Sequence, residues 1–279
     1  MEKIYKYIED HASLPSEALK WVVKQTHIRT NHARMLSGFA QGQLLRMFAQ
    51  MIGAKRILEL GTFTGFSAIC LGSALPEDGH MDTLELNDEL EDLIYGGFER
   101  AGLSDKIDVH FGDCKETLKR FASEDRQYDL VYIDANKREY CEYYDLVFDM
   151  IRPGGLILGD NVIWDGKVCM DPLPQDKQTL SIVAFNDRVS ADPRVELSVY
   201  KASYYFDNNE NHSLYASVCN IGMFVGLVFP KNTTKDNKTR LEINTSASVI
   251  EIGYDGRIID ASVSWLTIGV TYLYKYSKF

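Results

Sequence analysis

The sequence predicts an α/β protein with a doubly wound, mostly parallel sheet. Short β-rich runs alternate with helical patterns between residues 56 and 160. The first run ends at Gly61 and opens a helix, and an acidic residue, Glu85, ends the second run. Because open α/β sheets bind ribose-bearing cofactors with this arrangement, the pattern predicts a cofactor-dependent enzyme.

Composition indicates a soluble globular protein that acts on a small molecule. The 279 residues are 45% hydrophobic and 25% charged, and the formal net charge is −10. Nucleic acids and anionic membrane surfaces would repel this charge, so neither is expected as a partner. The five cysteines form no Cys-x-x-Cys pair and there is no apolar signal segment, which favours a reducing cytoplasm over a disulfide framework or a structural zinc site.

Three helices are predicted ahead of the sheet. Apolar residues recur with helical spacing, for example at Leu44, Leu45 and Phe48. Pro15 separates the first helix from the second. The predicted ranges are 2–11, 16–29 and 37–52.

The sheet itself is expected from five short runs and the helices between them. The predicted strands are 56–61, 80–86, 106–111, 128–134 and 155–160, and the helices lie near 64–75, 88–101, 115–122 and 137–151. A further helix at about 177–190 leads to a sixth strand candidate at 194–200. This alternation predicts parallel strands with helices on both faces.

The chain divides near residue 200 into a main domain, 1–200, and a C-terminal β-rich extension, 201–279. The extension has 8 Lys or Arg and 7 Asp or Glu, so the negative charge belongs to the main domain. Turn signals separate its short alternating runs, which predicts antiparallel hairpins. These runs are Ser213–Val218, Thr239–Ile243, Ser248–Ile252, Ile258–Ser264 and Leu266–Tyr274.

Residues just after the predicted strands form a candidate cofactor site, because ligands bind at the carboxyl ends of parallel strands. Gly61 and Gly65 would let the backbone approach a cofactor whose carboxylate binds near Ser67. Glu85 would accept hydrogen bonds from ribose hydroxyls, and Asp113 would face an adenine amino group. The alternatives are a plain strand-to-helix turn at the glycines, a solvated acid at Glu85 and a helix N-cap at Asp113.

Asp134, Asp160 and Asn161 form a candidate metal site. They follow two neighbouring predicted strands and offer hard oxygen ligands, which suit Mg²⁺. Without a cation, adjacent carboxylates would repel and one would have a raised pKa. The alternative is that the two acids are independent N-caps of the following helices.

Three segments together resemble one known family, the cation-dependent O-methyltransferases that include catechol and caffeoyl-coenzyme A O-methyltransferases. The segments are Leu58–Ser67, Tyr132–Lys137 with Tyr140, and Gly159–Trp164 with Gly166. They occur in the family's order and spacing, and the resemblance covers about residues 20–200.

The resemblance implies an S-adenosylmethionine-dependent, Rossmann-like methyltransferase fold and a homodimer. It implies a cofactor pocket made by Met35, Glu59, Gly61, Gly65, Ser67, Glu85, Asp113 and Asp134. It also implies that Asp134, Asp160 and Asn161 hold Mg²⁺ or another divalent cation such as Mn²⁺ or Ca²⁺. Lys137 would lie near the reacting hydroxyl, and Asp134 and Lys137 would be catalytic. Trp164 would flank the acceptor ring, with a buried structural tryptophan as the alternative.

The sequence departs from this family at two places. Asn136 stands where caffeoyl-type members commonly have aspartate. Family members usually end in a short hairpin after a segment like Asp192–Val195, whereas residues beyond about 200 do not resemble that ending. We therefore expect either that Ser198–Val218 forms the last two strands or that the sheet lacks an edge.

The predicted reaction is methyl transfer from S-adenosylmethionine to a hydroxyl of a catechol-like ortho-diphenol. The cation would lower the hydroxyl pKa while Lys137 accepts or relays the proton. A first-turn surface lysine is the alternative for Lys137. Two other functions remain open, a nucleotide-binding oxidoreductase and an inactive binding protein, although the missing Gly-x-Gly-x-x-Gly disfavours a nicotinamide cofactor.

Overall fold

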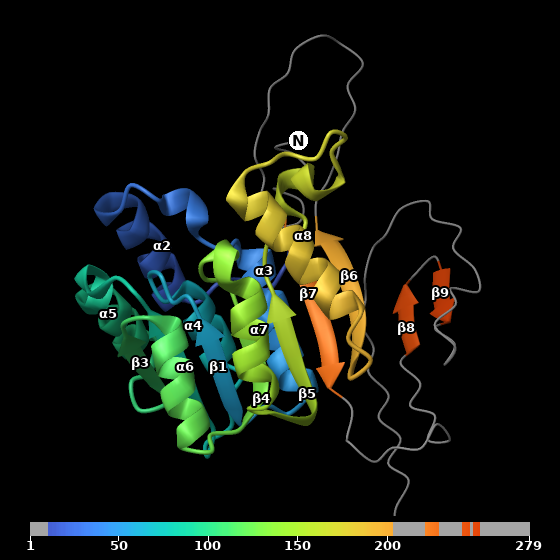
Figure 1. The fold of residues 1–279 in the computed structure, drawn as a ribbon. Helices are drawn as coiled ribbons and strands as arrows, with labels where there is room; N and C mark the ends of the chain where they lie inside the picture. Colours follow the sequence, from blue (N-terminus) through green and yellow to red (C-terminus); the bar gives the residue numbers. More distant parts are fainter. Residues whose placement is uncertain (1–10, 203–220, 229–241, 246–247, 252–279) are drawn as a thin grey trace, which may run out of the picture. The chain divides into compact units, whose positions relative to one another are not determined.

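A seven-stranded sheet lies at the centre of the larger of two compact units, Met1–Phe229. The computed structural model describes residues 11–202, 221–228, 242–245 and 248–251. The strands follow the order β3-β2-β1-β4-β5-β7-β6 (Figure 1). The parallel strands are β1 (Arg56–Leu60), β2 (His80–Glu85), β3 (Ile107–Phe111), β4 (Tyr128–Ile133) and β5 (Ile151–Gly159).

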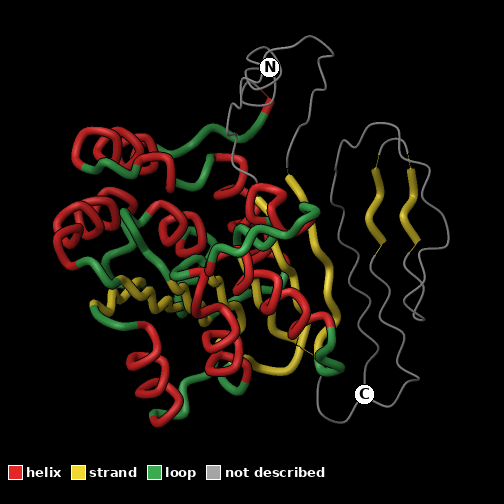
Figure 2. Tube along the Cα trace, turned by 45° about the horizontal axis from the view of Figure 1, so that its top comes forward, coloured by secondary structure: helices red, strands yellow, loops and turns green. Residues whose placement is uncertain are grey.

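Helices cover both faces of this sheet, as the prediction of a doubly wound fold requires (Figures 1 and 2). The α-helices are α2 (Glu17–Arg29), α3 (Phe39–Met51), α4 (Phe66–Gly72), α5 (Glu91–Ala101), α6 (Cys114–Ser123), α7 (Tyr140–Phe148) and α8 (Lys177–Ser190). Short 3₁₀ turns are η1 (Ala33–Met35), η2 (Asp88–Leu90), η3 (Lys137–Glu139) and η4 (Trp164–Cys169). The predicted fold class is thereby confirmed. None of the described helices is long and apolar enough to cross a membrane.

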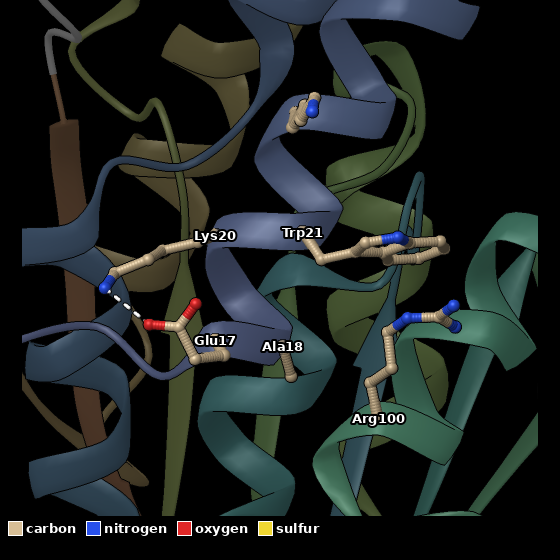
Figure 3. Close-up of a pocket in the computed structure, with 6 residues that line it drawn as sticks. Glu17, Ala18, Lys20, Trp21 and Arg100 are labelled. Atoms are coloured by element: carbon tan, nitrogen blue, oxygen red, sulfur yellow. Dashed lines mark hydrogen bonds and ion pairs between the residues drawn. The ribbon is translucent and has the colours of Figure 1, made fainter.

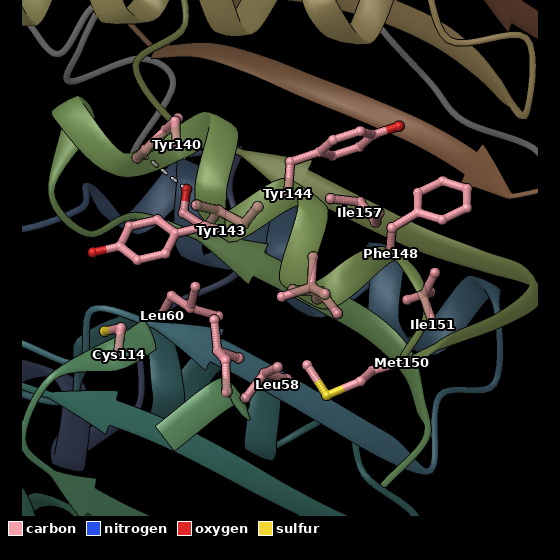
Figure 4. Packing of buried hydrophobic residues seen from close by; sticks show 14 of the residues in the cluster. Leu58, Leu60, Cys114, Tyr140, Tyr143, Tyr144, Phe148, Met150, Ile151 and Ile157 are labelled. Atoms are coloured by element: carbon pink, nitrogen blue, oxygen red, sulfur yellow. Dashed lines mark hydrogen bonds between the residues drawn. The ribbon is translucent and has the colours of Figure 1, made fainter. Parts of the chain in front are cut away.

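Alternation along β1 divides the core into two layers. Leu58 and Leu60 pack with residues of α6, α7 and α8 (Figure 4), whereas Ile57 packs with residues of α2 to α5. Successive strand side chains point to opposite faces, so one buried strand supplies both layers. Glu59 therefore points to the same face as Ile57, toward helices α2 to α5, where it is completely buried.

The end of the sheet differs from both sequence-based alternatives. β6 (Val195–Ala202) lies at the edge and pairs antiparallel with β7 (Ile221–Val228). β7 in turn pairs antiparallel with β5. The sheet thus has its edge, but its inner strand comes from residues 221–228 and not from Ser198–Val218. The compact unit that contains the sheet therefore extends to Phe229, past the boundary that the charge pattern predicts near residue 200.

A further difference concerns the boundary between a helix and the strand after it. The helix predicted over 137–151 ends at Phe148, and Ile151 already pairs with Tyr128 at the start of β5.

In the second unit, Pro230–Phe279, the described residues form an antiparallel pair, β8 (Glu242–Thr245) and β9 (Ser248–Glu251). The predicted helix 2–11, except its last residue, and the runs at 213–218, 258–264 and 266–274 lie outside the described residues.

Candidate active site at the carboxyl ends of the strands

Gly61 lets the carboxyl ends of β1 and β4 approach each other closely. Its φ is +99°, and a Cβ atom at this position would lie 2.2 Å from the backbone oxygen of Asp134. Side chains other than hydrogen are excluded by both the backbone conformation and the contact. The strand-to-helix turn therefore needs glycine here for packing as well as for any ligand.

Asp134 and Asp160 reach the same buried hydroxyl. Tyr132 Oη lies 3.0 Å from Asp160 Oδ2 and 3.4 Å from Asp134 Oδ2. Asn136, and not Asp134, is the N-cap of η3. The two acids are therefore neighbours in one site, and the alternative of two independent N-caps does not describe them.

Burial raises the pKa of Asp134 to about 7. The nearby charge of Lys137 lowers this pKa, while the charge of Asp160 raises it. The negative charge of Asp160 thus makes Asp134 harder to ionise than it would be alone. A cation between them would remove this repulsion.

Lys137 is held inside the site. Its Nζ atom donates to Asp134 Oδ1 at 2.6 Å and to Tyr140 Oη at 2.6 Å, and its side chain is 11% exposed. The Tyr140 hydroxyl lies 3.0 Å from the Ile133 backbone oxygen. Lys137 is therefore not the surface residue of the alternative interpretation.

The loop after β5 has an unusual backbone. Asn161 and Trp164 have φ values of +58° and +46°, a region that non-glycine residues rarely adopt. The backbone N–H of Asn161 donates to Asp160 Oδ1 at 2.6 Å. The indole Nε1 of Trp164 is buried and makes no hydrogen bond with the described residues. This loop thus places Asn161 next to Asp160 and leaves the Trp164 indole donor without an acceptor among the described residues.

Glu59 lies beneath the predicted cofactor site. Thr83 donates to Glu59 Oε2 at 2.6 Å, and Thr62 and Thr83 hydroxyl oxygens are 2.6 Å apart. Oε1 is buried without a hydrogen bond of normal geometry, although the Ser67 hydroxyl is close enough to favour the charged form. Burial nevertheless raises the pKa of Glu59 to about 7. A buried oxygen that lacks a hydrogen bond of normal geometry with the described residues is a position at which a ligand donor would be stabilised.

The other predicted cofactor residues occupy different settings. Glu85 accepts hydrogen bonds from the backbone N–H groups of Phe63 and Asn87 at 2.6 and 2.9 Å, and burial raises its pKa. It is therefore not a free solvated acid. Asp113 is the N-cap of α6, which is the alternative that the sequence offers to a contact with the adenine amino group.

The remaining predicted cofactor residues lie in or next to helices. Gly65 has φ +85° and precedes α4, whose first turn contains the buried Ser67. Met35, the last residue of η1, is 57% exposed. Binding roles for these residues stay predictions.

Comparison with known proteins identifies the family. The O-methyltransferase family profile matches residues 9–203. The chain belongs to the O-methyltransferase family. It is 32% identical to caffeoyl-CoA O-methyltransferase 2 of Zea mays over 206 residues. The match covers 70% of this chain and 78% of the Zea mays protein. It is 31% identical over 210 residues to tricin synthase 1 of Oryza sativa subsp. japonica, covering 70% of this chain and 82% of that one.

Solved O-methyltransferase structures share the fold. An enzyme from Bacillus cereus in complex with SAH has a TM-score of 0.71 and 27% identity, covering 81% of this chain and 97% of that one. TomG of Streptomyces achromogenes in complex with SAM has a TM-score of 0.73 and 26% identity, covering 82% and 96%. The predicted class, an S-adenosylmethionine-dependent O-methyltransferase, is confirmed, and the oxidoreductase alternative is set aside.

Sequence reasoning missed three polar residues of this O-methyltransferase site: Gln41, Tyr132 and Tyr140 as hydrogen-bonding groups. Gln41 Nε2 donates to Asp160 Oδ2 at 2.8 Å and lies 3.1 Å from Tyr132 Oη. Gln41 and Asp160 are 119 positions apart, so no local pattern joins them. The one available signal was a glutamine among the apolar positions of a helix that packs on the sheet.

A second group of metal-ligand atoms occurs elsewhere in the described part of the chain. One ligand atom from each of His80, Asp82 and Asp108 lies within 4.8 Å of the others. Asp82 accepts hydrogen bonds from Arg126 Nη1 at 2.8 Å and from Tyr128 Oη at 2.8 Å. His80 begins β2, so this cluster starts at the amino end of the sheet. The guanidinium already neutralises Asp82, and the cluster is a structural network.

A shallow surface hollow lies between α2 and α5, away from these residues (Figure 3). Its volume is about 460 Å³, and Arg100 stacks on Trp21 with 3.9 Å between Cζ and the ring centroid. Lys20 pairs with Glu17 at 2.7 Å beside it. The hollow contains none of the predicted site residues. Arg100, which lines it, also donates a hydrogen bond to the Gly96 backbone oxygen.

Proposed function

We propose that this O-methyltransferase moves the methyl group of S-adenosylmethionine to one hydroxyl of an ortho-diphenol bound to a divalent cation. The observation that carries the proposal is the meeting of Asp134 and Asp160 at the Tyr132 hydroxyl. Two carboxylates from neighbouring strand ends, followed directly by Asn161 after Asp160, offer hard oxygen ligands. Mg²⁺ fits this ligand set, and Mn²⁺ or Ca²⁺ could occupy it too.

The electrostatics of the protein support a bound cation. Asp134 has a pKa raised by burial and by the nearby charge of Asp160, so the pair is unfavourable when both acids are ionised. A divalent cation would reverse this cost. When bound, it would also stabilise the ionised form of a coordinated hydroxyl and so lower that hydroxyl's pKa.

The cofactor would lie along β1, β2 and β3. Glu59 Oε1 is a buried acceptor to which no described residue donates with normal geometry, which suits a cofactor amino group. Glu85 ends β2, where its carboxylate could accept from ribose hydroxyls in addition to two backbone N–H groups. The complexes of the Bacillus cereus and Streptomyces achromogenes enzymes with SAH and SAM support this assignment.

Lys137 would handle the proton of the acceptor hydroxyl. Its Nζ atom is positioned by Asp134 and Tyr140. The ammonium would first release one of its own protons, to the Asp134 carboxylate 2.6 Å away or to solvent, and the resulting amine would then accept the proton of the acceptor hydroxyl. The rest of the catalytic effect would come from alignment of the nucleophile with the methyl group. Proximity and orientation can contribute about 7–11 kcal/mol in such sites.

A phenolic acceptor is supported by the relatives. Caffeoyl-CoA O-methyltransferases and tricin synthase 1 are named for phenolic molecules. Trp164, in the loop after Asp160, offers an aromatic ring for stacking with such a substrate.

We also propose that the chain forms a homodimer and that it acts in the cytoplasm. Light scattering on the purified chain would test the first proposal, and cell fractionation would test the second.

The proposed function is tested by incubating the full chain with S-adenosylmethionine, Mg²⁺ and a panel of ortho-diphenols. Mass spectrometry should find one methyl group in place of a hydroxyl hydrogen on diphenols and not on matched monophenols. Excess chelator should abolish this methylation. Tight S-adenosylhomocysteine binding without turnover on any acceptor would instead favour the inactive binding protein, and turnover in chelator would refute the role of the cation.

A further inference from the structure

Gln41 connects helix α3 to the proposed metal site. Its side-chain amide donates to Asp160 Oδ2 at 2.8 Å, and the same Nε2 atom is 3.1 Å from Tyr132 Oη. All three residues are buried, and Gln41 is only 4% exposed. Breaking these hydrogen bonds would leave the buried amide without partners, which costs free energy because water cannot replace them. The contact is therefore stable once α3 has docked.

The position of α3 is set by close packing next to Gln41. A Cβ atom at Gly42 would lie 2.5 Å from Cys70 Sγ and 2.9 Å from the Phe66 ring. Only glycine therefore allows this turn of α3 to contact α4 so closely. Gln41 thus reaches Asp160 from a rigid element and not from a loop.

Neutral donors surround Asp160 on both oxygens. Oδ2 lies within hydrogen-bonding distance of Gln41 Nε2 and Tyr132 Oη, and Oδ1 accepts from the backbone N–H of Asn161. Asp134, by contrast, pairs with the charged Lys137. Neutral donors orient a carboxylate without adding a positive charge that would compete with a cation.

We propose that Gln41 is a positioning residue that holds Asp160 in the orientation needed to bind the divalent cation. Tyr132 is the second member of this support, since its hydroxyl is near both carboxylates. The inference rests on the proposed function, because it assigns Gln41 a role at the same cation site. Residues that orient metal ligands typically change metal affinity by about 10–100-fold when they are removed.

The test measures Mn²⁺ binding to the full chain without methyl donor or acceptor, by electron paramagnetic resonance of the free ion. Gln41→Leu should weaken Mn²⁺ binding about 10–100-fold, and Tyr132→Phe should also weaken it. S-adenosylhomocysteine affinity, measured by calorimetry, should stay within a few-fold of the unsubstituted chain. Gln50→Leu is the matched control, because Gln50 is exposed on the same helix.

A double-variant cycle separates positioning from loss of structure. Because Gln41 and Tyr132 act on the same Asp160 oxygen, Gln41→Leu with Tyr132→Phe should weaken Mn²⁺ binding by less than the product of the two single effects. Gln41→Met, which has an unbranched side chain of similar length, replaces Gln41→Leu if circular dichroism shows that the latter is unfolded. A full product of the two effects would contradict the shared action on Asp160.

The outcomes distinguish this inference from the function on which it rests. If the unsubstituted chain binds Mn²⁺ and a folded Gln41 variant binds it equally well, the positioning role is overturned and the cation proposal stands. If the unsubstituted chain binds no Mn²⁺, the cation proposal fails and the role of Gln41 fails with it. Weakened Mn²⁺ binding together with unchanged cofactor affinity supports both.

Discussion

The ammonium group of Lys137 donates a hydrogen bond to Asp134, with 2.6 Å between Nζ and Oδ1. This pair joins the proposed proton-handling residue directly to a proposed metal ligand. Lys137→Met should therefore lower kcat about 10²–10⁴-fold, the usual effect of losing an acid–base group. S-adenosylhomocysteine affinity should change little. Steady-state kinetics would check this, with Lys119→Met as a control at an exposed lysine that pairs with Glu116; an unchanged kcat would remove Lys137 from the mechanism.

Asp160→Asn keeps the shape of the side chain and removes its charge. We expect methyl transfer to fall about 10³-fold, equivalent to about 4 kcal/mol, because a weakened cation site loses its stabilisation of the ionised hydroxyl. Cofactor binding should persist. Asp108→Asn is the matched control, since Asp108 belongs to the second cluster with His80. Loss of methyl transfer in Asp108→Asn, and not in Asp160→Asn, would place the metal in that cluster.

The buried carboxyl of Glu59 makes stability depend on pH. Burial raises its pKa from 4.5 to about 7, so between these values the folded chain holds a proton that the unfolded chain has released. The free energy of unfolding should therefore fall as pH rises through this window, by about 3 kcal/mol for this group. Its contribution is complete below pH 4.5 and lost above about 7.

Glu59→Gln isolates this contribution because the amide does not titrate. Urea unfolding of both chains at pH 5 and pH 8, without cofactor, would measure the difference. The unsubstituted chain should lose stability relative to Glu59→Gln on going from pH 5 to pH 8. A constant difference between the two chains would mean that Glu59 does not bind a proton in the folded state.

Truncation should show which residues complete the sheet. β7 pairs with β5 over Leu156–Gly159 and also with β6. A chain that ends at Val218 lacks β7 and would expose the edge of β5, so we expect it to aggregate or unfold. A chain that ends at Phe229 keeps the compact unit and should stay soluble with S-adenosylhomocysteine affinity intact. Equal solubility of the two products would show that β7 is dispensable.

The sequence alone determined the parallel core and its functional edge. Alternating apolar runs predicted β1 to β5, because strand and helix periods are local properties of the chain. Gly61 was expected to need freedom at the strand end, and its φ of +99° agrees. The acids Asp134 and Asp160 were expected to be close because parallel strands bring their carboxyl ends to one edge.

Only the tertiary structure decided how segments distant in the sequence complete the sheet and the site. The continuous apolar run of β7 carries no alternation, and nothing local shows that it enters the sheet between β5 and β6. Likewise, Gln41 meets Asp160 across 119 positions because Gly42 lets α3 pack closely on α4. Local periodicity encodes an element's own shape, whereas the choice of its neighbour depends on how all the buried surfaces fit together.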